Sequence, residues 1–330
     1  MSILGRAVGS SGLAFGLDVG SRRARVVGLA RGSSGEFLLQ HAAIADFTDP
    51  ASASLAIKSL WRGVAARAEG ARCNLGPAGV IVQQIEFPEM ETDELLAAAR
   101  IEAEQLIPDI QSMALDVQVI GKKTKSEDNA QVAAIMIVAA PRQAVDKRTA
   151  LLESAKVRIE AIVPDGVALA NAVLALQPSE QGAVLAIDLG IDATGFVAVF
   201  PEKNIMVPIV RYIPNGTSLL GGAAAGEKPS STDERDRETK RERWLREIER
   251  SIGFVSGKLG APAQKILVVG DGAKSPEILN WLGQNVQIPV SVWNPLKDLK
   301  RGPGAPEQKF IEQWGSDCAV AVGLALGEGD

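Results

Sequence analysis

Two turns in this chain place an aspartate at the end of a strand-like run and follow it with a glycine and a hydroxyl side chain. A glycine lets backbone N–H groups approach phosphate oxygens, because no Cβ stands in the way. A carboxylate at a strand end can hold Mg²⁺ directly or through water. The residues of these types are Asp18, Gly20 and Ser21 in the first turn and Asp188, Gly190 and Thr194 in the second. The pattern suits a site for a metal-bound phosphate, although each turn alone is also common in ordinary β-hairpins.

A third glycine-rich turn lies between a strand-like run and a helical one. Through Gly270, Gly272 and Ala273 it could pack against a ribose or an adenine, and it would expose helix N–H groups. The same turn also suits a tight connection that needs no ligand. The chain contains no Gly-x-x-x-x-Gly-Lys-Ser/Thr sequence, so a P-loop nucleotide site is not indicated.

The elements that would position these turns occur twice in the same order. Periodicity in the first half predicts the order β-β-β-α-β-α-β-α, over Phe15–Val19, Arg25–Ala30, Glu36–His41, a helix through Leu55–Val64, Gln131–Ala139, Arg142–Ser154, Val157–Val163 and Asp165–Leu176. The second half repeats this order over Ala183–Leu189, Thr194–Phe200, Asn204–Ile213, Trp244–Leu259, Lys265–Gly270, Ser275–Leu282, Val286–Val292 and Asp317–Leu326. The repeat predicts two related lobes facing each other across a cleft, the plan of the duplicated actin-like (ribonuclease H-like) α/β fold.

Two segments interrupt the duplication. Residues 85–128 are predicted to form an inserted α+β subdomain in the first lobe, with a strand ending at Phe87, a helix over Thr92–Ile107, a strand over Leu115–Ile120 and a polar loop over Gly121–Asn129. The apolar side of that helix is expected to cover the subdomain's own sheet. Gly221–Arg243 is polar and mixed in charge, so a flexible loop or a poorly packed start of a helix is expected there. The predicted lobes are 13–180 and 181–330.

Composition disfavours several classes of function. The 330 residues carry a net charge of −5, whereas nucleic-acid-binding domains usually carry a basic excess, so no nucleic-acid partner is expected. The two cysteines, Cys73 and Cys318, form no metal or disulfide pattern, which fits a reducing cytoplasm. The single histidine, His41, disfavours both a His-ligated metal centre and a Ser-His-Asp triad. No apolar run approaches the ~18 residues of a membrane span, so any membrane role is expected to act through a partner.

Several stretches resemble successive parts of the PilM family of type IV pilus assembly proteins. They read FGLDVGSRRARVVGL, IEFPEMETDELLAAARIEAEQLIP, LDVQVIG, VAAPRQAVDKRTALLESAKV, AIDLGIDATGF, KILVVGDGAKSPEIL and CAVAVGLALG. The resemblance starts near Leu13 and has its gap at Gly221–Arg243. Its most distinctive part is the acidic helix that ends in Glu-Gln-Leu-Ile-Pro, which sugar kinases and heat-shock chaperones of the same fold do not share.

The resemblance implies a cleft that binds ATP with Mg²⁺. The matching residues are Asp18, Gly20 and Ser21 in the first phosphate loop, Asp188, Gly190 and Thr194 in the second, and Gly270, Gly272 and Ala273 in the adenosine turn, with Asp18 and Asp188 as metal ligands. Asp165 matches an acidic position that could orient an attacking water, and it is equally placed to cap the N-terminus of a helix.

Three departures from the family pattern concern this cleft. Asp271 stands where the family has another glycine, which adds a carboxylate near a polyanion. Ile191 and Ala193 replace small and hydroxyl residues of the second phosphate loop. The stretch before Trp244, which in the family carries nucleoside-binding helices, is short. We therefore expect nucleotide binding to be weak, altered or lost.

The resemblance also implies a partner. In this family the insertion and the first lobe form a groove for the N-terminal cytoplasmic peptide of PilN, a single-span membrane protein; an extended peptide gains main-chain hydrogen bonds and side-chain pockets in such a groove. The leading hypothesis is a cytoplasmic adaptor held at the inner face of the inner membrane through its partners. The alternative is an active actin-superfamily ATPase or phosphotransferase acting on a small substrate. An FtsA-type cell-division protein is disfavoured because no basic amphipathic helix follows the closing helix.

Overall fold

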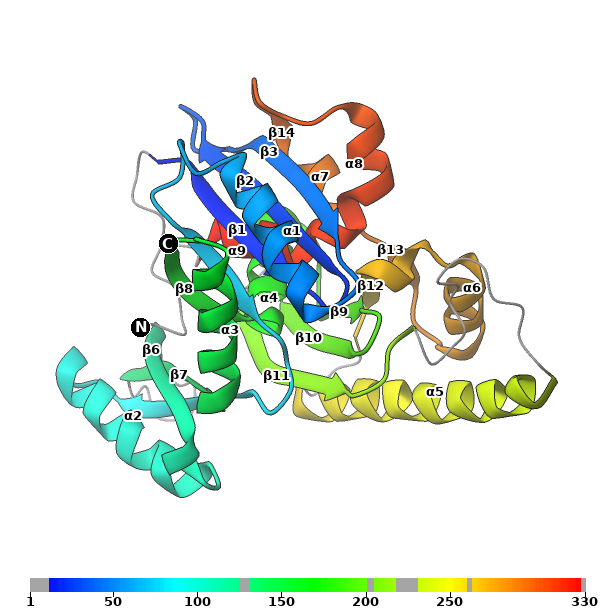
Figure 1. Ribbon diagram of the computed structural model, residues 1–330. Coiled ribbons are helices and arrows are strands. Elements are labelled where there is room, and N and C mark those ends of the chain that lie inside the picture. Colours follow the sequence, from blue (N-terminus) through cyan, green and yellow to red (C-terminus); the bar gives the residue numbers. More distant parts are fainter. Residues whose placement is uncertain (1–11, 125–130, 201–204, 218–230, 260–262, 328–330) are drawn as a thin grey trace.

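The structure is a computed structural model that describes residues 12–124, 131–200, 205–217, 231–259 and 263–327. Its first sheet has the strand order β14-β3-β2-β1-β4-β8 (Figure 1). These strands are β1 (Ala14–Val19), β2 (Arg23–Arg31), β3 (Phe37–Asp46), β4 (Ala71–Leu75), β8 (Ile159–Pro164) and β14 (Lys300–Arg301). The first three strands form an antiparallel meander, and β4 and β8 extend the sheet in parallel from β1.

The second sheet repeats this plan in the order β11-β10-β9-β12-β13. Its strands are β9 (Val184–Leu189), β10 (Thr194–Phe200), β11 (Ile205–Ile213), β12 (Lys265–Val269) and β13 (Val290–Val292). Again a meander comes first and two parallel strands follow. The equivalent helices of the two halves are α1 (Pro50–Arg62) and α5 (Ser231–Leu259), α3 (Arg142–Ser154) and α6 (Pro276–Asn285), and α4 (Asp165–Leu176) and α9 (Ala319–Leu326). The predicted duplication and two-lobed fold are confirmed.

The two closing helices join the halves. Helix α4 packs against α9 and against β10 and β11 of the second sheet, whereas α9 packs on β1, β2 and β4 of the first. A single buried core accordingly contains apolar residues from both sheets and from both helices. The helices approach closely at Gly323, where a Cβ would lie 1.7 Å from the carbonyl oxygen of Ala168. Each closing helix therefore packs on the sheet of the other half, and these contacts fix how the lobes meet.

A third sheet, β5-β7-β6, forms the inserted subdomain with α2 (Thr92–Leu106) on one face. Its strands are β5 (Ile81–Pro88), β6 (Met113–Thr124) and β7 (Gln131–Pro141). Leu95, Ala99 and Ala103 of α2 are buried against this sheet, as expected. Because β6 continues to Thr124, the polar loop predicted over Gly121–Asn129 is wrong for residues 121–124, and residues 125–129 lie outside the described residues. The lobe boundaries 13–180 and 181–330 stay a prediction.

The strand predicted over Gln131–Ala139 was assigned to the sheet of the first lobe, and this is wrong. As β7 it is the central strand of the inserted sheet, which therefore draws strands from both sides of the predicted insertion, 85–128. One face of β7 packs towards α2 through Ile135 and Ile137, and the other packs towards α4 and α9 through Met136 and Val138. A strand buried on both faces reads as a continuous apolar run whichever sheet it joins. The missing fourth strand of the lobe is β4, whose sequence ARCNL carries no such run.

Helix α5 begins at Ser231, so from that residue onward the second reading of Gly221–Arg243, a poorly packed start of a helix, is confirmed and the flexible loop is wrong. Residues 221–230 lie outside the described residues. Ion pairs at helical spacing, such as Arg246–Glu242, line its exposed surface. Such pairs stabilise a helix that has little apolar surface to bury. Further along, Trp244 is buried and stacks on Trp281 of α6 with ring centroids 5.7 Å apart. Opposite charges four residues apart, such as Glu242 and Arg246, are the sequence pattern that indicates a helix in this stretch.

The last part of the chain returns to the first sheet. Strand β13 begins at Val290 and not at the predicted Val286, because Val286 caps the C-terminus of α6 and a bend at residues 287–288 follows it. After β13 come α7 (Pro295–Asp298), β14 and α8 (Gln308–Trp314). Strand β14 pairs in parallel with β3 at the edge of the first sheet. None of the helices in the described ranges combines the length and the apolar character that crossing a bilayer requires.

Candidate functional site

A cavity of about 320 Å³ lies between the two lobes. Its volume is at the lower end of the range for small-molecule pockets. The residues predicted from sequence that line it are Asp18, Gly20 and Ser21 from the first turn, Asp188 and Gly190 from the second, Gly270 from the third, and Asp165. The structure thus brings the three turns and Asp165 to one place, as the sequence predicts.

Three predicted residues do not line the cavity. Thr194 is fully buried, and its hydroxyl donates to the carbonyl of Asn215 at 2.9 Å and accepts from Trp244 Nε1 at 3.0 Å. Gly272 packs against Leu189, since a Cβ there would lie 2.7 Å from the Leu189 Cβ. Ala273 belongs to the buried core of the second lobe. These contacts give each residue a role in packing the second lobe.

Backbone geometry brings the third turn against the second. Gly270 has φ +85°, a conformation that favours glycine. A Cβ at this position would lie 2.1 Å from Asp188 Oδ1. The backbone of the turn therefore occupies the space beside the Asp188 carboxylate.

The first turn satisfies its own backbone. The N–H of Gly20 donates to the carbonyl of Arg23 at 2.9 Å, which closes the β1–β2 hairpin. The side chain opposite Asp18 in the register of this hairpin is Arg25. A buried Arg25 Nη1 donates to Asp18 Oδ2 at 3.1 Å, and Arg25 Nη2 donates to Asp271 Oδ2 at 2.7 Å. Arg25 thus neutralises a carboxylate of the first turn and one of the third.

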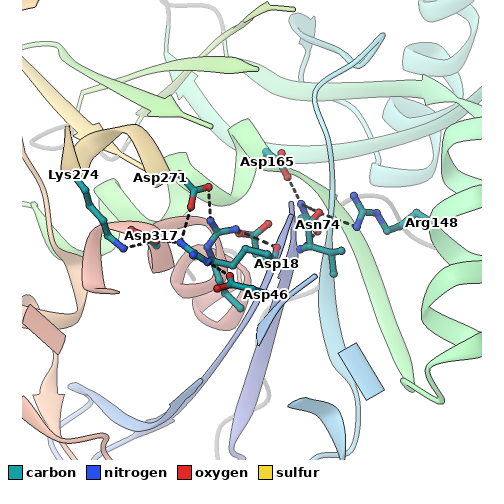
Figure 2. Close-up of polar contacts among 11 residues, drawn as sticks. Asp18, Asp46, Asn74, Arg148, Asp165, Asp271, Lys274 and Asp317 are labelled. Atoms are coloured by element: carbon teal, nitrogen blue, oxygen red, sulfur yellow. Dashed lines mark hydrogen bonds and ion pairs between the residues drawn. The ribbon is translucent and has the colours of Figure 1, made fainter. Parts of the chain in front are cut away.

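Arg23 extends this network to three further carboxylate contacts, and Figure 2 labels the partners Asp46, Asp271 and Asp317. Its Nη1 lies 2.9 Å from Asp271 Oδ1 and 3.0 Å from Asp317 Oδ2, and its Nε lies 2.5 Å from Asp46 Oδ1. Asp317 also accepts from Lys274 Nζ at 2.9 Å. The three cations and four carboxylates, including Asp18, form a connected set of ion pairs across the cleft.

Asp165 lies at the other end of the cavity. Its Oδ1 accepts from Asn74 Nδ2 at 2.9 Å, and Asn74 Oδ1 in turn accepts from the N–H of Val19 at 2.7 Å. Residue Pro164, not Asp165, occupies the N-cap of α4, so the alternative N-cap role is wrong. Arg148 also borders the cavity and donates to the carbonyl of Val19 at 3.0 Å.

Several of these carboxyls hold their protons more tightly than usual. Burial, followed by the negative charge of Asp18, raises the pKa of Asp165 well above its ordinary value, against the lowering effect of the Asn74 hydrogen bond. Burial and the charge of Asp18 also raise the pKa of Asp188 to about 7. Burial raises the pKa of Asp18 too, although Arg25 opposes the shift. A protonated Asp165 is a poor acceptor for a proton from water.

These contacts do not fit a magnesium-bound nucleotide. Asp18, predicted as a metal ligand, is already paired with a guanidinium, which stays charged at any physiological pH. The cavity lining carries six aspartates against two arginines, so a polyphosphate would meet an excess of negative charge. Within the described ranges, no group of three or more His, Cys, Asp or Glu side chains is placed to hold a metal ion.

The residues that sequence reading missed are the partners of the predicted ones. Arg23 and Arg25 are two positions apart on β2 and so share one face of the strand. Two like charges at that spacing inside an apolar strand were an available signal. Asp317 comes from a turn far along the chain, before α9, and Asn74 from a strand that was not predicted. No local pattern connects them with the β1–β2 hairpin.

Comparisons with known proteins agree with the expected family. A family model described as type IV pilus assembly protein PilM matches residues 16–206. No curated protein sequence matches the chain. Among solved structures, a PilM-PilN type IV pilus biogenesis complex superposes with a TM-score of 0.74 at 22% identity, over 95% of this chain and 97% of that one.

Two further solved structures superpose with lower scores. A Bacteroides thetaiotaomicron protein with an actin-like ATPase fold and unknown function gives a TM-score of 0.47 at 9% identity, over 87% of this chain and 92% of that one. The ethanolamine utilization protein EutJ from Carboxydothermus hydrogenoformans gives 0.48 at 13% identity, over 98% of this chain and 92% of that one.

Proposed function

This chain belongs to the PilM family of type IV pilus assembly proteins, and we propose that it is an adaptor that binds the N-terminal peptide of a PilN-like membrane protein. Through that peptide it would be held at the cytoplasmic face of the inner membrane. The observation that carries the proposal is the family match, together with the likeness over nearly the whole chain to a PilM solved with PilN. Nucleotide chemistry is not part of this function.

The inserted subdomain is the part of the molecule best suited to receive a peptide. Of the exposed large apolar side chains among the described residues, Ile101 and Leu106 lie on α2 and Ile120 lies on β6. The outer strands β5 and β6 of the inserted sheet each pair with β7 on one side. An extended peptide can use main-chain groups of such a strand and place alternate side chains against apolar surface.

We propose that the three turns and Asp165 line a cleft of the nucleotide-binding type that holds ion pairs in place of Mg·ATP. Asp18, Gly20, Ser21, Asp188, Gly190 and Gly270 lie around one cavity, in the arrangement that the family resemblance implies. The ion pairs of Arg23 and Arg25 argue against Mg·ATP as the occupant. Among the described residues that line the cavity, the acidic excess disfavours an active phosphotransferase.

The test is a calorimetric titration of the full chain with a synthetic N-terminal peptide of the PilN-like protein from the same operon. Saturable binding that is absent with a scrambled peptide would support the adaptor. Substituting Ile101→Ser together with Ile120→Ser should weaken binding by about tenfold or more, since each buried apolar side chain contributes about 1.5–3 kcal/mol.

The matched control is Leu55→Ser on α1, where a side chain of similar exposure lies outside the inserted subdomain. It should leave the affinity unchanged. Failure of the wild-type chain to bind the peptide would sink the adaptor hypothesis. Equal losses in the control and in the double variant would show that the inserted subdomain is not the receptor surface.

A further inference from the structure

Three ion pairs cross from the first lobe to the second. Arg25 Nη2 lies 2.7 Å from Asp271 Oδ2, and Arg23 Nη1 lies 2.9 Å from Asp271 Oδ1 and 3.0 Å from Asp317 Oδ2. The arginines come from β2 of the first sheet. The aspartates come from the turn after β12 and from the turn before α9, which are themselves joined by a hydrogen bond from the Gly270 N–H to the Ser316 carbonyl at 3.0 Å.

These groups are shielded from water. The side chains of Arg25 and Asp317 are 4% and 0% exposed, and those of Arg23 and Asp271 are each 18% exposed. Hydrogen bonds between charged groups are stronger than neutral ones, and burial weakens the screening by salt. Separating the lobes would leave Asp271 without a cation and would remove bridging partners from Arg23, Arg25 and Asp317, which is costly unless water reaches these groups.

Three of the four bridging side chains, Arg23, Arg25 and Asp317, are also held within their own lobes. Arg25 is paired with Asp18 and Arg23 with Asp46 in the first lobe, while Asp317 is paired with Lys274 in the second. The Trp314 ring lies under both cations, 4.5 Å from the Arg23 guanidinium carbon and 3.5 Å from Lys274 Nζ. Because Arg23, Arg25 and Asp317 have partners that do not depend on the lobes meeting, less ordering is needed to form the three bridges.

From this geometry we propose that Arg23 and Arg25 of the first lobe and Asp271 and Asp317 of the second form an ionic latch that keeps the cleft closed without a nucleotide. Two lobes joined across a cleft are biased towards closure by any group that contacts both of them only in the closed arrangement. In this protein the four charged side chains are the groups that contact both lobes. The adaptor surface would then be presented by one fixed arrangement of the lobes.

The latch does not depend on the identity of the partner, so its test uses the full chain with neither peptide nor nucleotide. Hydrogen–deuterium exchange and small-angle X-ray scattering are compared for the wild type and Asp271→Asn. The substitution removes two bridges and leaves the pairs of each arginine inside the first lobe. Amides of the β1–β2 turn and of residues 270–274 should exchange about tenfold faster or more, because a hydrogen bond to a charged group is lost. The radius of gyration should increase.

The matched control is Glu180→Gln. It removes the pair between Lys265 and Glu180, which is 2.6 Å long and partly buried, joins the start of β12 to the connection before β9, and does not line the cavity. It should leave exchange at the cleft unchanged. Asp271→Glu, which keeps the charge, should remain closer to the wild type than Asp271→Asn does.

Arg23→Gln provides a second route if Asp271→Asn does not fold. It removes both Arg23 bridges while Arg25 keeps its buried partners. Faster exchange confined to the cleft in either folded variant supports the latch. Exchange and scattering that match the wild type and Glu180→Gln in the folded variants would overturn it, as would a wild-type protein whose cleft amides already exchange at the rate of the variants.

Discussion

At the scale of single residues, the cleft is governed by how its carboxylates are neutralised. Asp18 and Asp271 are paired with arginine, whereas Asp165 and Asp188 lie in the same cavity and respond to burial by holding their protons. The groups that act on the charge of Asp188 are Asp18, Arg25, Asp271 and Asp317. Burial raises the pKa of Asp18 as well, although its pairing with Arg25 opposes that shift, so the arginine lessens the cost of the buried charge without removing it.

Asp188→Asn should stabilise the protein at alkaline pH and have little effect at acid pH. The folded-state pKa of about 7 exceeds the ordinary value of 3.8, so the folded protein binds more protons than the unfolded chain between these values. Stability contributed by this group consequently falls as pH rises through that window. Three pKa units correspond to up to about 4 kcal/mol. Thermal unfolding at about pH 4.5 and about pH 8 measures the difference.

Asp146→Asn is the control, because Asp146 is an exposed residue within α3. This substitution removes one negative charge from the surface and leaves the buried carboxyl of Asp188 in place. Equal changes in melting temperature for the two variants at alkaline pH would contradict a specific cost of burying Asp188.

At the scale of elements, the crossing of α4 and α9 determines how the halves join. At Gly323 the two helices approach so closely that no side chain would fit between them. The neighbouring strand β1 makes a similar approach at Gly16, where a Cβ would lie 2.1 Å from the Ala321 carbonyl. The sequence around Gly323, AVAVGLAL, gives no amphipathic stripe because the helix is buried on all sides.

Gly323→Ala should destabilise the protein by about 3 kcal/mol, the upper part of the range for overpacked sites. Its Cβ would overlap the carbonyl of Ala168, which is backbone and cannot rotate away. Denaturant unfolding measures the change in free energy.

Gly253→Ala is the matched control in α5, since nothing lies within 4 Å of a Cβ placed there. Alanine is preferred over glycine inside a helix, so this variant should gain about 0.5–1 kcal/mol. A gain in both variants would mean that α4 and α9 can move apart without cost.

At the scale of the whole molecule, the actin-like plan is kept, and ion pairs between the two lobes cross its cleft. Helices α4 and α9, each packed on the sheet of the other half, join the lobes on one side. The ion pairs of Arg23 and Arg25 span the cleft. The inserted subdomain carries exposed apolar side chains of its own. The arrangement suits a protein that presents a surface to a partner.

A titration with Mg·ATP should show no saturable heat in the wild type. The acidic lining of the cavity and the pairing of Asp18 both oppose a polyphosphate. A parallel titration of the synthetic peptide shows that the preparation is competent. Saturable binding of Mg·ATP that weakens in Asp18→Ala or Asp188→Ala would contradict this expectation and restore the ATPase reading.

The sequence alone determined the family, the duplicated α/β plan and the three turns that meet at the cleft. These features are local: a strand, a glycine turn and an apolar helix face each leave a pattern within a few residues. The turn residues Asp18, Asp188 and Gly270 are therefore predicted to lie together from the sequence, because the duplication puts each of them at the end of a strand beside the cleft.

Tertiary structure decided which sheet each buried strand joins and what the cleft residues contact. Strand β7 was assigned to the wrong sheet because a strand buried on both faces looks alike in either one. The pairing of Arg25 with Asp271 joins residues far apart in sequence, and no local periodicity encodes it. Whether a strand-end carboxylate is free for a metal depends on such distant cations, because electrostatic neutralisation acts through space and not along the chain.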